Sequence, residues 1–179
     1  MGQVSVDFRF HRTLDSVTLE TNRTGTGDCW AEFSPAFSLR TGVVSVEMNG
    51  RPLPFQIQPN GEDQHVSVRF PVYGGPNSVV IRVKNDFGLT LSNQLPALGS
   101  TSRGLRVLSN SWNSAGNQLT VEVSGVPGMD YELGVWNPGQ ISSLEGAVLS
   151  KQGNIRIEMP VEKDADYLHH TVVIHFGTR

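Results

Sequence analysis

Cysteine is nearly absent from the chain, since Cys29 is the only one among 179 residues. A single cysteine excludes a disulfide within the chain and a cysteine-rich zinc site. The sequence also lacks any run of about 18 apolar residues, which excludes a transmembrane helix. At its start no charged segment precedes an apolar one, so we expect no signal peptide. The immediate entry into a strand-like pattern leads us to expect a piece of a longer protein.

Charged residues are also sparse, at 17% of the chain, with 14 Lys and Arg against 17 Asp and Glu. Without a basic excess the chain has nothing to hold a phosphate backbone, so nucleic acid is not an expected partner. A low charge density disfavours long surface helices, which are usually rich in Glu, Lys and Arg. The 19 glycines and 10 prolines indicate many turns.

What the chain does have is an alternation of apolar and polar residues with a period of two. The stretch VSVDFRF places Val6, Phe8 and Phe10 on one face, which predicts a half-buried strand. The stretch VVSVEM repeats the pattern, with Val44 and Val46 predicted to face inward. About eight such short strands, with turn signals every 8 to 12 residues or so, are typical of a β-sandwich.

The alternation stops between Asn93 and Gly104, in NQLPALGSTSRG, and restarts afterwards. A structureless loop of about 12 residues is uncommon inside a compact domain, so we interpret this stretch as the linker between two domains. The predicted fold is all-β, with two tandem antiparallel β-sandwich domains of the Ig-like or fibronectin III-like kind. Their predicted bounds are 1–93 and 105–179, with a linker at 94–104. The inward residues predicted for the second domain include Leu119, Val121, Val123, Leu133, Ile155, Ile157, Val172, Ile174 and Phe176.

No catalytic motif is found in the sequence. There is no nucleophile elbow and no P-loop, and GTGDCW lacks the third glycine of a dinucleotide-binding loop. His169 and His175 share a strand face but lie about 20 Å apart, too far to bind one ion. Cys29 shares its face with apolar neighbours, which predicts a buried and inert thiol. We therefore expect a protein that is not an enzyme, with no metal ion and no cofactor.

Two tryptophans are the candidate ligand-binding residues. Trp136 lies opposite the apolar face of its predicted strand, so its ring is expected to point outward. Together with Trp112 it could stack on a sugar ring, with Asn137 and Gln140 as hydrogen-bond partners. The alternative is that both indoles, which are amphipathic, cover sheet ends or pack against the other domain.

The segment VVSVEMNGRPLPFQIQPNGEDQHVSVRFPVYGGPNSVVIRVKNDFG carries a pattern of valine-rich strands separated by glycine- and asparagine-containing turns. The turns are Asn49-Gly50, Gly75-Pro76-Asn77 and Asn85-Asp86-Phe87-Gly88. In this pattern the segment, residues 43–88, resembles bacterial Ig-like β-sandwich accessory domains, although the Cys…Trp…Cys core of antibody domains is absent. The resemblance implies a module that sits beside catalytic domains of secreted or surface proteins, where it spaces them, packs on them or binds glycans.

Three functions follow from these features. The first is a non-catalytic accessory or structural region that spaces or supports neighbouring domains of a larger bacterial protein. The second is a carbohydrate-binding module that uses exposed tryptophans. The third is a non-catalytic fragment of a glycan-processing enzyme. The expected partners are neighbouring domains of the parent protein and, under the second function, a glycan. If the chain is such a fragment, a secreted, periplasmic or cell-surface location is favoured.

Overall fold

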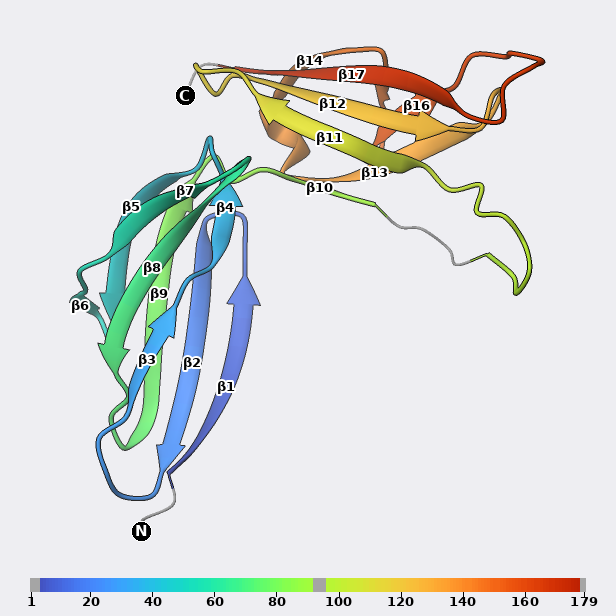
Figure 1. Cartoon of the computed structure of the whole chain (residues 1–179). Helices are drawn as coiled ribbons and strands as arrows, with labels where there is room; N and C mark the ends of the chain where they lie inside the picture. Colours follow the sequence, from blue (N-terminus) through green and yellow to red (C-terminus); the bar gives the residue numbers. More distant parts are fainter. Residues whose placement is uncertain (1–3, 92–95, 178–179) are drawn as a thin grey trace. The chain divides into compact units, whose positions relative to one another are not determined.

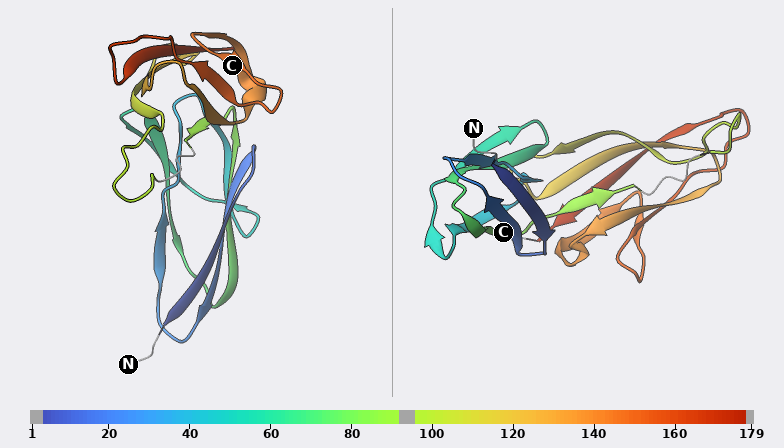
Figure 2. Two further views of the ribbon diagram at one scale, coloured as in Figure 1. Left: turned by 90° about the vertical axis from the view of Figure 1, so that its right-hand side faces the viewer. Right: turned by 90° about the horizontal axis from the view of Figure 1, so that it is seen from below.

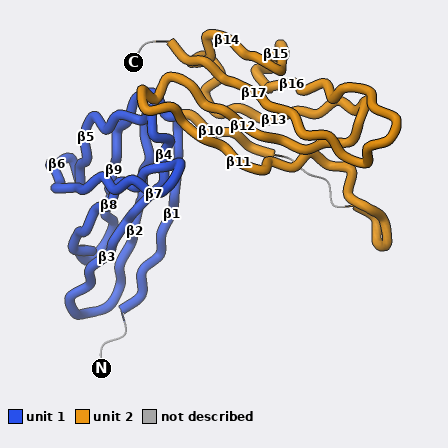
Figure 3. Tube along the Cα trace, turned by 45° about the horizontal axis from the view of Figure 1, so that its top comes forward, with its two compact units in different colours: residues 1–86 blue, residues 87–179 orange. Residues whose placement is uncertain are grey.

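The computed structural model describes residues 4–91 and 96–177 and is all-β. The strand alternation therefore predicted the fold class correctly. The chain forms two compact units, Met1–Asp86 and Phe87–Arg179 (Figure 3). Among the described residues, no helix is long and apolar enough to cross a membrane.

The first unit contains two antiparallel sheets (Figure 1). The larger sheet has the order β1 (Ser5–Arg12), β2 (Ser16–Thr24), β9 (Gly75–Lys84), β5 (Gly42–Met48) and β6 (Arg51–Pro52). The smaller sheet is built around β8 (Asp63–Pro71), which pairs with β3 (Trp30–Phe33), β4 (Ala36–Ser38) and β7 (Gln56–Asn60). The N–H of Val66 donates to the carbonyl of Pro35 (3.1 Å), so β3 and β4 follow the same edge of β8. The prolines around β7 fit its position, because β7 pairs with β8 alone.

The core of the first unit lies between these two sheets. Figure 2 shows the strands from two further directions. Buried side chains from both sheets form it: Val17, Phe37, Val46, Val66, Val68, Ile81 and Val83 in one cluster, and Met48, Phe70, Val72 and Val79 in another. Val44, which was predicted to face inward, points away from this core. The pairing of β5 with β9 shifts register between Val43 and Ser45, so Val43 packs on the core and Val44 is 62% exposed.

Strand β1 has the predicted alternation but not the predicted burial. It forms one edge of the five-stranded sheet and pairs with β2. Val6 is 36% exposed, Phe8 77% and Phe10 50%. Phe10 makes an edge-to-face contact with Phe33 of the smaller sheet, at 6.2 Å between ring centroids. The alternation identified the common face of these residues correctly, but the smaller sheet leaves most of that face open.

The second unit consists of two antiparallel sheets of four strands each. One has the order β10 (Gly88–Thr90), β13 (Asp130–Trp136), β16 (Ile155–Glu158) and β15 (Val148–Leu149). The other has the order β11 (Arg106–Trp112), β12 (Gln118–Gly125), β17 (Leu168–Phe176) and β14 (Ile141–Glu145), and a 3-10 turn, Pro138–Gln140, precedes β14. The core between them contains nine residues that were predicted to face inward: Leu119, Val121, Val123, Leu133, Ile155, Ile157, Val172, Ile174 and Phe176. His170, which the alternation placed on the same face of its strand, is only partly buried and does not belong to this core.

The boundary between the units differs from the predicted one. It lies between Asp86 and Phe87 rather than at residue 93, because Phe87 is buried in the second core and β10 pairs with β13. The predicted linker, 94–104, falls inside the second unit; its first two residues lie outside the described residues. The hydroxyls of Tyr131 and Tyr167 donate to the carbonyls of Arg103 (2.8 Å) and Ser102 (2.7 Å). These hydrogen bonds attach Ser102 and Arg103 of the predicted linker to the second unit.

Candidate functional site

The outer face of the smaller sheet in the first unit carries an exposed tryptophan. On β3, Ala31 and Phe33 pair with the buried Phe70 and Val68 of β8 and share their inward face. Trp30 has the opposite parity, and its side chain is 60% exposed. A large aromatic side chain on a half-buried strand usually faces the core, so the outward indole makes this surface a candidate for binding.

Arg69 of β8 holds this indole from one side. Its guanidinium carbon lies 5.4 Å from the centroid of the Trp30 ring, which is a cation–π contact. Arg69 is paired in register with Glu32, the next outward residue of β3. The ring therefore stands beside a guanidinium and a carboxylate on adjacent strands. We call the surface formed by these residues and their outward neighbours the Trp30 face; it comprises Trp30, Glu32, Ser34, Gln56, Gln58, Asn60, Asp63, His65, Ser67 and Arg69.

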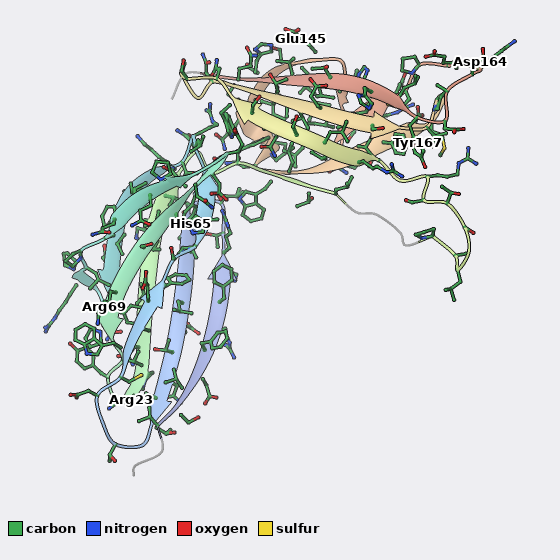
Figure 4. The ribbon with its side chains drawn as sticks, in the orientation of Figure 1. Arg23, His65, Arg69, Glu145, Asp164 and Tyr167 are labelled. Atoms are coloured by element: carbon green, nitrogen blue, oxygen red, sulfur yellow. The ribbon has the colours of Figure 1, made fainter. Side chains whose placement is uncertain are left out.

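Polar side chains continue the Trp30 face along β8, from which His65 and Arg69 project (Figure 4). The hydroxyls of Ser34 and Ser67 lie 2.7 Å apart, and Nδ1 of His65 lies 3.2 Å from the carbonyl of Ser34. On the neighbouring strand β7, Nδ2 of Asn60 lies 3.4 Å from Nε2 of His65. These contacts hold the polar side chains against one another, so much of their geometry is set before a ligand arrives.

A hollow of about 390 Å³ lies at the middle of this sheet. Its walls include the polar side chains of Glu32, Gln56, Ser67 and Arg69, with Pro54, Phe55 and Val68 completing the lining. Carboxylate, guanidinium, amide and hydroxyl groups thus line a hollow that also contains the exposed ring of Phe55, and Arg69 connects this hollow to the Trp30 ring. That combination suits a ligand with many hydroxyl groups and an apolar C–H face, because each kind of surface has a partner.

Ser34, His65 and Asp63 lie close together, as a nucleophilic triad would require, but their contacts do not suit one. A carbonyl oxygen can only accept a hydrogen bond, so the contact between His65 and the Ser34 carbonyl requires Nδ1 to carry the proton. Nδ1 then cannot take the proton of the Ser34 hydroxyl, 3.4 Å away. A general base must offer an unprotonated nitrogen to its nucleophile. The arrangement is better suited to holding the polar side chains in place.

The tryptophans predicted from the sequence lie in the second unit. Trp112 stacks on Phe176, at 5.2 Å between centroids, and meets Phe87 edge to face at 6.3 Å. Its ring therefore packs against the core and is not an open platform. Trp136 is partly buried, and its indole Nε1 is buried with no hydrogen-bond partner among the described residues.

Asn137 and Gln140 lie beside Trp136, at the start and end of the short 3-10 turn. Asn137 has a left-handed backbone conformation, with φ of 64°. The structure thus brings together three of the four predicted site residues in one segment. Trp112 is on a strand of the other sheet of that unit.

Trp30 could have been found by the same argument that selected Trp136. In CWAEF it has the parity opposite to Cys29, Ala31 and Phe33, so that argument would have placed its ring on the outward face. Cys29 packs against the first core but is only partly buried, whereas its parity predicted a buried thiol. What the sequence could not supply was the register of β3 against β8, which places Glu32 opposite Arg69.

No group of three or more metal-ligating His, Cys, Asp or Glu residues occurs in the described part of the chain. His175 instead accompanies Glu145, with 2.8 Å between Nε2 and the carboxylate. Comparison of the chain with protein-family models, with curated proteins and with solved structures finds no match.

Proposed function

We propose that the chain is a non-catalytic accessory region of a larger protein, and that its first unit binds carbohydrate on the Trp30 face. The observation that carries the proposal is the 60% exposed indole of Trp30 on an outward sheet face. A pyranose ring can stack its C–H face on this indole, while Glu32 and Arg69 bond its hydroxyls. The polar wall of the adjacent hollow then sets which hydroxyl positions are accepted.

The Ig-like resemblance of residues 43–88 supports the same proposal. It covers β5 to β9, which include the central strand β8 of the Trp30 face. Accessory domains of that family pack beside catalytic domains or bind glycans. The accessory role explains why the polar groups of this face bond to one another rather than form a catalytic arrangement.

The test is a screen of the whole chain on an array of neutral oligosaccharides, followed by titration of each retained sugar. Trp30→Ala should weaken binding at least tenfold, or about 1.4 kcal/mol. Phe8→Ala is the matched control, since Phe8 is an exposed aromatic ring (77%) on the other sheet of the same unit. Trp136→Ala tests the site predicted from the sequence.

Each outcome separates the candidates. Loss of binding in Trp30→Ala alone supports the Trp30 face. Loss in Trp136→Ala alone places the sugar in the second unit and refutes the Trp30 face. If no sugar is retained at millimolar concentration, carbohydrate binding is refuted. The spacing role is then favoured by the two compact units, each with its own buried core.

A further inference from the structure

Strand β1 is an open edge of the larger sheet in the first unit. It pairs with β2 over eight residues, Ser5 to Arg12, with no shift of register, and forms no other ladder among the described residues. An edge strand presents a row of backbone N–H and C=O groups that another strand can pair with. Natural edges are often blocked by a proline or a bulge, and β1 contains neither.

The exposed side chains of β1 add to the tendency of this edge to pair with another strand. On the face directed toward the smaller sheet, Val6, Phe8 and Phe10 form an apolar row, and all three are exposed. The opposite face of the strand carries Asp7 and Arg9, which are also exposed. Arg9 lies opposite Glu20 of β2, but no salt bridge joins them among the described residues.

The order of these residues is self-complementary. If a second β1 strand pairs antiparallel with the first about a two-fold axis at Phe8, each Asp7 faces Arg9 of the second copy. The apolar face then matches as well, because Val6 meets Phe10 of the second copy and the two Phe8 rings meet at the axis. Directly opposite side chains of opposite charge stabilise a strand pair, as do aromatic pairs.

Neighbouring registers do not have this property. An axis at residue 7 places Asp7 against Asp7 of the second copy, and an axis at residue 9 places Arg9 against Arg9. Like charges directly opposite each other are destabilising. An axis at Phe8 is therefore selected by both charge and apolar matching.

We propose that β1 joins two copies of this chain by antiparallel β1–β1 pairing centred on Phe8, which extends the five-stranded sheet across a two-fold axis. The pairing is isologous, so it closes at a dimer and satisfies the open edge of both copies. It also places the two apolar rows side by side, which buries part of the surface that the smaller sheet leaves exposed. The inference is independent of carbohydrate binding, since the Trp30 face belongs to the other sheet.

The test is the oligomeric state of the whole chain, measured by sedimentation equilibrium over a range of concentrations up to several hundred micromolar. We expect a monomer–dimer equilibrium. Asp7→Arg and Arg9→Asp should each raise the dissociation constant of the dimer at least tenfold, because each places like charges opposite one another across the β1–β1 interface. The double variant D7R/R9D restores opposite pairs and should return the constant to within about threefold of the parent value.

The control is Arg82→Asp, which reverses an exposed charge on β9 of the same sheet, away from the edge. It should leave the dissociation constant unchanged. Thermal melts of every variant verify that the first unit stays folded. A parent chain that is monomeric at the highest concentration, or that forms larger assemblies, overturns the proposal. So does a double variant no tighter than either single one.

Discussion

Replacing Ile174 by alanine should unfold much of the second unit at temperatures where the first unit is still folded. Ile174 is fully buried on β17 and pairs with Leu119 of β12 on one side and with Leu144 of β14 on the other. Its removal deletes three carbon groups, each worth about 0.8 kcal/mol of transfer free energy. The cavity left between two paired strands adds to this, so the expected total loss is about 2–5 kcal/mol.

The second unit has limited stability to lose. Domains of its size are stabilised by roughly 5–14 kcal/mol, and each kcal/mol shifts the melting temperature by about 4–8 °C. A fall of roughly 8–40 °C in the melting temperature of the second unit is therefore expected. Every buried residue in the core around Ile174 belongs to the second unit, so the transition of the first unit should not move.

Val173→Ala is the matched control, because Val173 is the neighbouring residue on the opposite, partly exposed face of the same strand. Its loss should cost less than that of Ile174. Scanning calorimetry measures both variants, and amide spectra recorded at rising temperature assign each transition to its unit. An Ile174→Ala protein that melts within about a degree of the parent would refute the reasoning.

Three further predictions concern stability and reactivity. Arg12→Ala removes a guanidinium that lies 2.6 Å from the fully buried Asp86 carboxylate, to which the Thr41 hydroxyl also donates a hydrogen bond (3.1 Å). It should destabilise the first unit by about 3 kcal/mol in urea unfolding; a loss below about 1 kcal/mol contradicts the pairing argument. Tyr131→Phe removes the bond to the Arg103 carbonyl, so limited proteolysis near that residue should become faster, and an unchanged rate counts against the anchoring role. Cys29 packs against the first core, so a thiol reagent should label it slowly until denaturant is added; fast native labelling would show an accessible thiol.

The alternation of the sequence predicted most of the strands and their inward faces, because a pleated strand turns every second side chain to the same side. It could not predict the exposure of Phe8. Alternation identifies residues that share a face, whereas burial depends on whether another sheet covers that face. The neighbouring sheet leaves Phe8 open, although it reaches Phe10 through Phe33.

The unit boundary was missed for a related reason. The segment near Arg103 has an irregular sequence that is typical of a linker, but long-range hydrogen bonds from tyrosine hydroxyls hold it in place. Such bonds leave no local signal in the sequence. The Trp30 face depends on long-range information in the same way, since only the register of β3 against β8 places Arg69 beside the ring.

The most direct measurement of the proposed function is an NMR titration that follows the indole N–H signals of the chain's three tryptophans. The titrant is the neutral oligosaccharide that the array retains best. The account predicts that the Trp30 signal shifts in proportion to saturation, while the signals of Trp112 and Trp136 stay in place. A Trp30 signal that does not move at millimolar concentrations of any neutral oligosaccharide on the array would contradict it.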